Sequence, residues 1–397
     1  MEIGAQWVGP TQDRVLALIA ELGLETFPTY STGRNIFERG GKISHYSGTI
    51  PRTNPFGLAE VGIAMKRLNL MAAKVPPESP WTAPSARRWD SETFATWMRR
   101  NVRTAVARDI MRLAIIGVWA AEPEDVSLLH VLFYIRSAGT LEILTDTEGG
   151  AQQDRVVGGT QLISLRMAEE LGEGVVALDS PVRALAHSHD GVTVSSDRLT
   201  VSAKRVIIAV PPTLAGRIAY DPTLSARRDG LSQRMAQGSV VKCMAVYERP
   251  FWRDRGLSGA ITSVTGPVSV GFDNSPPDGS PGVLLGFLEG RAAREAADLP
   301  QAERRKLVAE SFGRLFGPEA ANPIDYVDRA WGAEEWSRGC YGGFLPPGAW
   351  TDYGRALREP IGAIHWAGAE TALVWNGYMD GAVGSGQEAA RAAHAAL

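Results

Sequence analysis

The feature that most constrains the fold is a continuous apolar run at residues 206–210, which ends at Pro211 and Pro212. A strand with one face in water alternates apolar and polar residues, whereas a continuous apolar run suits a strand buried on both faces of a parallel sheet. We therefore expect a sheet covered by helices on both sides. Strand-rich and helix-rich stretches interleave along the chain, which predicts a mixed α/β (α+β) fold with domains that are discontinuous in sequence.

Composition narrows the class of protein. The 397 residues carry 41 basic and 44 acidic side chains, a formal net charge of −3 that does not fit a general nucleic-acid binder. The 2 cysteines are too few for a disulfide framework or a cysteine-rich zinc site, and the histidines lack metal-ligand spacing, so no metal is expected. No apolar run approaches the length of a membrane span, and residues 1–10 do not resemble a signal peptide. We expect a cytoplasmic protein without membrane attachment.

Local patterns predict the main elements. Thr11 is expected to cap a helix that runs to about Leu22, and residues 33–47 read as a hairpin that turns at glycines 40 and 41. Residues 57–138 are mostly helical in pattern. Strands are expected at 175–178, 182–186, 192–195, 199–202, 240–247, 283–288 and 363–366, and a final helix from about Tyr378.

Two clusters of residues carry candidate chemistry. Lys242 lies within an apolar strand, where an ammonium group needs a partner or a task; by alternation it could equally face solvent. Cys340 and Tyr341 lie in an aromatic, glycine-rich loop, and a packed, buried cysteine is the alternative there.

A third cluster covers residues 366–382, where a strand ends at a glycine turn and a helix begins. Such a turn presents free N–H groups to an anion, although an ordinary strand–turn–helix connection is equally compatible. The glycines at 381, 384 and 386 superficially resemble a nucleotide-binding loop. They fall inside the helix pattern, so we interpret them as sites of close helix packing.

These clusters, together with the opening turn, resemble the flavin-containing monoamine oxidase family. The matching stretches follow the family order and cover essentially the whole chain: residues 4–11, 157–160, 206–212, 238–243, 250–252, 339–341, 346–348 and 368–382. The resemblance implies a two-domain flavin amine oxidase fold. It assigns residues 1–24, 153–231 and 334–397 to an FAD-binding parallel-sheet domain, and residues 25–152 and 232–333 to a mixed-sheet and helical substrate-binding domain.

The resemblance implies that FAD is the cofactor. The residues it places along FAD are Gly4, Ala5, Gln6 and Trp7 under the flavin ring, Trp331 beside it, Ala369, Glu370, Tyr378 and Met379 along the ring and its chain, and Val182 at the adenine. Cys340 matches the position that carries a thioether bond to the flavin in mitochondrial members. Many bacterial relatives bind FAD non-covalently, so both modes stay open.

The resemblance also implies roles at the substrate. Tyr341 and Tyr378 match two tyrosines that flank the amine in front of the flavin, where electron-rich rings orient the nitrogen. Lys242 matches a lysine that holds a water near flavin N5 and assists the reaction with oxygen, and burial there would lower its pKa. The expected substrate contacts are Leu144, Gln152, Gly286, Phe287 and the two tyrosines.

The implied reaction is oxidative deamination of primary or other small amines. The amine gives a hydride equivalent to the flavin, the imine hydrolyses to aldehyde and ammonia, and O2 becomes H2O2. An L-amino-acid or polyamine oxidase of the same fold is the alternative. An amino-acid substrate needs a cation for its carboxylate. Arg338 is the arginine within the motifs that contain Tyr341 and Tyr378.

Two departures from the family pattern matter. Family members begin with a strand, a GxGxxG turn and a helix that hold the FAD diphosphate, and these 397 residues contain no such segment. We therefore also consider an N-terminally truncated, non-catalytic remnant with weak or no FAD binding. The chain shows no membrane tail after its last helix, and a homodimer is compatible with the sequence.

Overall fold

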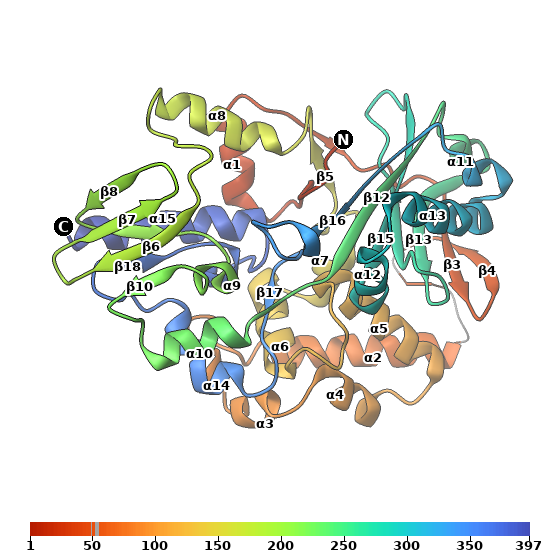
Figure 1. Ribbon diagram of the computed structural model, residues 1–397. Helices are drawn as coiled ribbons and strands as arrows, with labels where there is room; N and C mark the ends of the chain where they lie inside the picture. The colour runs from red at the N-terminus through yellow and green to blue at the C-terminus, as the bar shows by residue number, and fades with distance from the viewer. Residues whose placement is uncertain (49, 52–54) are drawn as a thin grey trace.

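The computed structural model describes residues 1–48, 50–51 and 55–397. Helices and several separate sheets are combined in a mixed α/β structure, as the sequence predicts (Figure 1). The two ends of the elongated molecule differ: the right side of Figure 1 holds a large antiparallel-rich sheet, and the left side holds smaller sheets beside the C-terminal helix.

The large sheet has 7 strands in the order β16-β12-β15-β14-β13-β3-β4. Their bounds are β16 Asp325–Ala330, β12 Val240–Tyr247, β15 Gly282–Glu289, β14 Val270–Asp273, β13 Leu257–Ser263, β3 Arg34–Arg39 and β4 Lys42–Tyr46. Every residue of β12 and β15 is buried, which explains their nearly continuous apolar sequences. Helices α12 (Gly290–Ala297) and α13 (Gln301–Phe316) contribute to the apolar core on one face of this sheet.

A layer of helices lies below the sheet in Figure 1 and forms the largest apolar core. It comprises α2 (Pro55–Ala72), α3 (Ala86–Asp90), α4 (Phe94–Asn101), α5 (Ala105–Trp119), α6 (Leu128–Ala138) and α7 (Leu141–Thr145). Threonines 93, 104 and 140 begin α4, α5 and α7, each accepting a hydrogen bond from the backbone N–H three residues later. These caps fix where the helices enter the layer.

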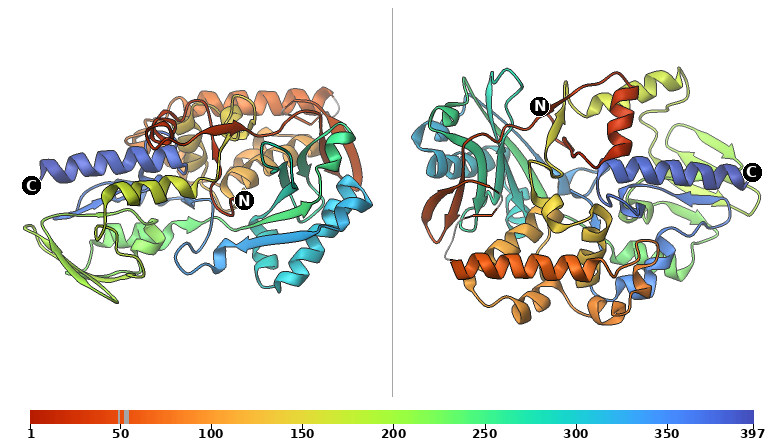
Figure 2. Two further views of the ribbon diagram at one scale, coloured as in Figure 1. Left: turned by 90° about the horizontal axis from the view of Figure 1, so that it is seen from above. Right: turned by 180° about the vertical axis from the view of Figure 1, so that it is seen from behind.

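The remaining elements surround the C-terminal helix α15 (Met379–Ala395), which packs against α1 (Asp13–Glu21), as the rear view in Figure 2 shows. Strand β9 (Val206–Ile208) pairs in parallel with β18 (Ile364–Trp366). A second sheet has the order β10-β6-β7-β8, with β10 Ala219–Asp221, β6 Val182–His187, β7 Val192–Ser196 and β8 Thr200–Ala203. The parallel pair confirms that the apolar run at 206–210 enters a parallel sheet.

Three local expectations need correction. Residues 175–178 form no strand and are exposed, because no neighbouring strand takes up their backbone groups. The run at 206–210 is not buried on both faces, since Ile207 and Val210 are 38% and 44% exposed. Thr11 does not cap α1: the cap position is Gln12, and the N–H groups of Arg14 and Val15 are bound by the side chain of Asp380 from α15.

The glycines of α15 confirm the packing interpretation. A Cβ atom at Gly381 would lie 2.2 Å from the backbone oxygen of Trp375, and one at Gly384 would lie 3.1 Å from the side chain of Arg14. Gly386 has nothing within 4 Å of its Cβ position. Two of the three glycines therefore permit close approach of neighbouring segments.

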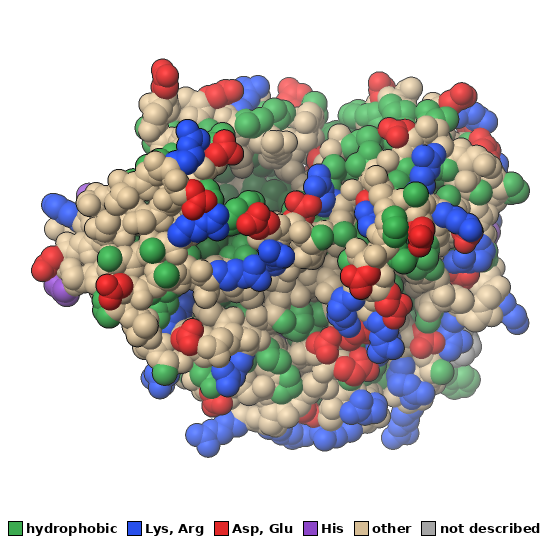
Figure 3. All heavy atoms as spheres, viewed as in Figure 1, with side chains coloured by type: hydrophobic (Ala, Val, Ile, Leu, Met, Phe, Trp, Pro, Cys, Tyr) green, Lys and Arg blue, Asp and Glu red, His purple; other side chains and the backbone are tan. Residues whose placement is uncertain are grey.

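The division into two domains stays a prediction. The helical core joins residues of both expected domains, since Leu231, Trp350 and Trp375 pack in the same apolar cluster as α2, α5 and α6. Acidic and basic side chains are interspersed over the face seen in Figure 3, in keeping with the small net charge. In the described part of the chain, no helix combines the length and apolarity needed to cross a membrane.

Candidate functional site

A cavity of about 600 Å³ lies where the large sheet, α5, α6, the loop after α7 and the start of α15 meet. It brings together most of the residues proposed from the sequence. Those that line it are Gly4, Ala5, Gln6, Trp7, Leu144, Gln152, Lys242, Phe287, Trp331, Cys340, Tyr341, Ala369, Tyr378 and Met379. Segments separated by hundreds of residues thus converge on one space.

Three of the proposed residues lie outside this lining. Gly286 faces the opposite side of the sheet, where a Cβ atom would lie 2.9 Å from Val268, so it does not line the cavity and its contact with substrate stays a prediction. Val182 begins strand β6 and is 39% exposed. Glu370 is buried behind the cavity, where it accepts a hydrogen bond of 3.0 Å from the backbone N–H of Gly343.

Lys242 lies on the cavity face of β12, directly opposite Phe287 of β15. Its side chain is 3% exposed, so the alternative in which it faces solvent is wrong. The ammonium group donates to the backbone oxygen of Gly4 at 2.8 Å and to the side-chain oxygen of Gln6. Burial lowers the pKa of Lys242 to about 7, which makes this amine able to gain or lose a proton near neutral pH.

Gln6 connects the lysine to the sheet. Its amide nitrogen donates to the side-chain oxygen of Asn274 at 3.0 Å, and Gln6 is 2% exposed. Both the nitrogen and the oxygen of the Gln6 amide are therefore hydrogen-bonded, which fixes the orientation of the oxygen that accepts from Lys242.

The two tyrosines line the cavity from different elements. The ring of Tyr341 meets the ring of Phe287 edge to face, with centroids 5.7 Å apart and planes at 79°. Its hydroxyl donates to the carboxyl group of Glu289 at 2.9 Å. Tyr378 packs edge to face on Trp375 at 4.9 Å. Burial is the main cause that raises the pKa of both phenols above the usual value, so both remain neutral in the physiological range.

The N-terminus of α15 opens toward the same cavity. Tyr378 is its cap residue, but no side chain caps the helix there, and Met379 and Ala382 line the space. The acidic residue of the first turn, Asp380, is instead turned to α1. The start of this helix therefore offers free N–H groups and a partial positive charge to a ligand.

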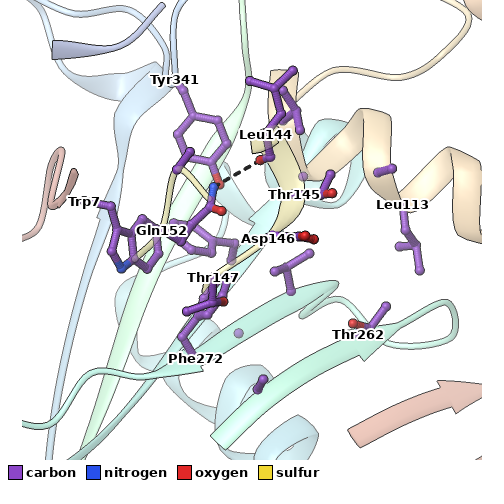
Figure 4. Close-up of a pocket in the computed structure, with 18 of the residues that line it drawn as sticks. Trp7, Leu113, Leu144, Thr145, Asp146, Thr147, Gln152, Thr262, Phe272 and Tyr341 are labelled. Atoms are coloured by element: carbon purple, nitrogen blue, oxygen red, sulfur yellow. Dashed lines mark hydrogen bonds between the residues drawn. The ribbon is translucent and has the colours of Figure 1, made fainter. Parts of the chain in front are cut away.

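Figure 4 shows the part of the cavity around Gln152, Trp7 and Tyr341. The Gln152 amide donates to the backbone oxygen of Leu144 at 3.3 Å, while its own buried oxygen has no hydrogen-bond partner among the residues that the structure describes. Trp7 meets Phe272 edge to face at 4.9 Å. A free amide oxygen beside aromatic rings suits an N–H donor from a ligand.

Several lining residues were missed from the sequence. Tyr134 of α6 lies 6.0 Å, ring to ring, from Tyr378, and Leu113 comes from α5. Both belong to helices whose apolar residues read simply as core. Phe272 lies on β14, and no motif marked that strand. Only alternation along β14, which places Val270 and Phe272 on one face, offered a signal.

The charges of the lining are unevenly distributed. Among the described residues, Lys242 is the sole lysine or arginine of the lining, whereas Asp146, Glu148 and Asp273 supply carboxyl groups. Asp273 is already bound by Arg253 at 2.7 and 3.0 Å. Arg338, considered above for an amino-acid substrate, lies outside the lining.

Comparison with known proteins identifies the family. The model of the family "Flavin containing amine oxidoreductase" matches residues 1–394. The chain belongs to this family. Its resemblance to monoamine oxidases is thereby confirmed, and membership makes it a flavoprotein that acts on amines.

Named relatives of this family share substantial identity with the chain. It is 44% identical over 389 residues to the Mycobacterium tuberculosis protein named "Putative flavin-containing monoamine oxidase AofH", covering 98% of this chain and 85% of that protein. It is 36% identical over 397 residues to the flavin-containing amine oxidase A of Bos taurus, covering 98% and 75%.

Solved structures of amine oxidases have the same fold. A putrescine oxidase bound to putrescine superposes with a TM-score of 0.96 at 36% identity, covering all of this chain and 88% of the other. Cyclohexylamine oxidase from Brevibacterium oxydans superposes with a TM-score of 0.94 at 30% identity, covering 99% and 87%. The flavin amine oxidase fold is therefore confirmed.

The residues of the cavity fit a flavin ring. A Cβ atom at Gly4 would lie 3.5 Å from the Trp331 ring, an ordinary van der Waals contact, so Gly4 and this indole lie side by side in the wall of the cavity. Trp331 is fixed by a hydrogen bond of 3.2 Å to the backbone oxygen of Ile3. The uncapped start of α15 suits the negative charge that a reduced flavin carries.

Proposed function

We propose that this amine oxidoreductase oxidises primary or other small amines held between Tyr341 and Tyr378. The observation that carries the proposal is the convergence of these tyrosines and Lys242 on one cavity, next to the uncapped start of α15. The products are the imine, which hydrolyses to aldehyde and ammonia, and H2O2.

The residues that would hold the flavin ring are Gly4, Ala5, Gln6, Trp7, Trp331, Ala369 and Met379, with Glu370 behind them and Val182 proposed for the adenine end. Bound FAD supplies a two-electron acceptor for the amine and passes the electrons to O2. FAD is bound either through a thioether bond to Cys340 or non-covalently, and the proposal includes both modes. Mass spectrometry of the denatured protein decides it, since unmodified chain with released flavin rules the bond out.

The chain's own residues bind and orient the amine. The two neutral phenols offer electron-rich rings to the substrate nitrogen. The unpartnered oxygen of Gln152 accepts an N–H, which fixes the rotation of the amine about its carbon–nitrogen bond. Leu144, Phe287 and Trp7 enclose the site with apolar surface, which keeps water away from the reacting carbon.

Lys242 can hold or release a proton on the cavity face of the large sheet. With a pKa of about 7, its amine is partly neutral at physiological pH and holds or releases one proton at Nζ. Gly4 and Gln6 fix the position of that nitrogen. We assign Lys242 to the step in which O2 is reduced, because O2 needs a nearby proton source as it takes up charge.

A polyamine or diamine substrate is the second candidate. It is favoured by the carboxyl groups of Asp146 and Glu148 in the lining, which suit a second ammonium group, and by the similarity to a putrescine oxidase. The amino-acid alternative receives less support, because the described lining holds no arginine for a carboxylate.

The test is peroxide production by the chain reconstituted with FAD. We expect yellow protein and H2O2 on addition of benzylamine or putrescine, with little on addition of L-leucine. Tyr341→Ala is the control with a weakened site and a raised KM, and Tyr353→Phe, outside the lining, is the matched control with unchanged activity. Yellow protein without peroxide from any amine would refute the proposed reaction. Colourless protein that gains no flavin would support the remnant alternative.

Two expectations remain proposals. We propose a homodimer, which size-exclusion chromatography with light scattering tests, and a cytoplasmic location, which fractionation of the native cells tests.

A further inference from the structure

One buried carboxyl group beside the cavity has no part in the function proposed so far. Glu289 is the last residue of β15 and is 3% exposed. It follows Phe287 by two positions, so both side chains leave the same face of the strand. Among the described residues, Glu289 forms no ion pair, and burial raises its pKa to about 7. Burying a carboxyl group costs stability unless hydrogen bonds compensate for the lost contact with water.

The position of Glu289 in the chain would ordinarily give it another task. It is the cap residue of α12, a position where a short polar side chain such as Asp or Ser usually accepts from the first backbone N–H groups of the helix. Its side chain makes no such bond. Glu122 takes this role instead, because its carboxyl group accepts from the N–H of Arg291 at 2.9 Å. The start of α12 is therefore capped by Glu122, and the side chain of Glu289 is left to make other hydrogen bonds.

The carboxyl group of Glu289 is turned to Tyr341. One oxygen accepts from the Tyr341 hydroxyl at 2.9 Å, and the other accepts from the hydroxyl of Ser269 at 2.6 Å. Phe287 holds the ring of the same tyrosine edge to face. Two residues of one strand therefore fix both the ring and the hydroxyl of a residue that the function above places against the substrate.

We propose that Glu289 is a positioning residue that fixes the orientation of Tyr341 and enriches the electron density of its ring. A phenol that donates to a carboxyl group gains electron density on its oxygen and ring, and a carboxylate enriches it more than a neutral acceptor does. An electron-rich ring attracts the cationic or polarised nitrogen of an amine. The proposal rests on the proposed function, because it takes Tyr341 to be the ring that faces the substrate.

The test is a double-mutant cycle on binding of benzyltrimethylammonium, measured by titration calorimetry on the full chain with FAD at pH 8.5. This probe has a permanent charge and carries no N–H, so its own state is independent of pH and it reports the aromatic cage. We expect Glu289→Gln to weaken binding about three- to tenfold, and to have no further effect in the Tyr341→Phe background. Glu122→Gln is the matched control: it lowers thermal stability and leaves the affinity unchanged.

Two readouts separate positioning from a purely structural role. With benzylamine as substrate, Glu289→Gln raises KM several-fold more than it lowers kcat, and Glu289→Leu, which removes the acceptor, has the larger effect. In a Lys242→Met background, affinity for the probe rises between pH 6 and pH 8.5 and is flat once Glu289→Gln is added. Within the described part of the chain, the other titratable groups near Glu289 are Tyr341, Cys340 and Glu122, and Glu122 is paired with Arg112. Tyr341 and Cys340 remain protonated through this range.

Equal effects of Glu289→Gln with and without the Tyr341 hydroxyl would overturn the proposal, as would no effect in either background. If Glu289→Leu does not fold, the cycle with the isosteric Gln variant decides alone. The proposed function fails separately: protein that binds the probe but makes no peroxide refutes the reaction, while the binding cycle still reports on Glu289.

Discussion

Lys242 and Phe287 stand directly opposite each other on the antiparallel strands β12 and β15, and both side chains enter the same cavity. The next pair on this face is Val240 opposite Glu289. One row of the sheet thus supplies an amine and an aromatic wall, and the next row supplies the carboxyl group that holds Tyr341. The paired strands β12 and β15 thus hold these side chains in fixed positions relative to one another.

Removing either cage ring should weaken amine binding. Tyr341→Ala and Tyr378→Ala are expected to raise KM for benzylamine about 3- to 30-fold, because an aromatic face contributes about 0.5–2 kcal/mol to the attraction of an amine nitrogen. Tyr378→Phe keeps the ring and should have the smaller effect. Steady-state peroxide assays measure KM, with Tyr353→Phe as the control. An unchanged KM in both alanine variants would remove the tyrosines from the site.

Loss of the Gln6 amide should affect the oxygen step through Lys242. Gln6→Leu removes one of the two acceptors that hold the ammonium group, so we expect reoxidation by O2 to slow about tenfold while anaerobic reduction by amine changes little. Stopped-flow absorbance separates the two steps. Gln233→Leu, at an exposed position, is the matched control. Equal slowing of both steps would contradict a specific link between Gln6 and the lysine.

Lys242 should impose a pH dependence on stability. Its pKa is about 7 in the folded chain and 10.5 by the ordinary value. Between these pH values the unfolded chain binds the extra proton, so the free energy of unfolding rises with pH, by at most about 1.4 kcal/mol per pH unit. Chemical denaturation at pH 7, 8.5 and 9.5 should show this rise in the wild type relative to Lys242→Met. Parallel curves for the two proteins would argue against a perturbed lysine.

A side chain at Gly381 should displace Trp375 and, through it, Tyr378. The Cβ atom of Gly381→Ala would meet the backbone oxygen of Trp375 at 2.2 Å, and Trp375 packs on Tyr378. We expect a loss of about 1–3 kcal/mol in stability together with a higher KM. Gly386→Ala lies on the same helix with open space around it and should be neutral or more stable by up to about 1 kcal/mol. Thermal unfolding compares the two, and similar midpoints would contradict the packing role.

Part of this site could be predicted from the sequence because its motifs are local. Tyr341, Cys340, Tyr378 and Lys242 lie in short stretches that resemble the family, and the cavity contains all four. Strand alternation could also have separated two of the expected substrate contacts. Gly286 and Phe287 are adjacent in a strand, so they face opposite sides of the sheet, and Phe287 is the one that lines the cavity.

Other features depend on contacts between distant segments. The cap of α1 comes from Asp380, and the cap of α12 comes from Glu122, so neither helix start could be read from its own flanking residues. The hydrogen bond from Tyr341 to Glu289 joins residues that are 52 positions apart. No periodicity or spacing records such pairs, because they arise only when the chain is packed.

Apolar periodicity and short motifs are properties of neighbouring residues, so the kinds of helices and strands and the family of this chain could be inferred before its structure was known. The inward direction and lowered pKa of Lys242, and the hydrogen bond from Tyr341 to Glu289, follow only from the folded arrangement. Burial and hydrogen-bond partners set the charge and direction of a side chain, and both are supplied by segments far away along the chain.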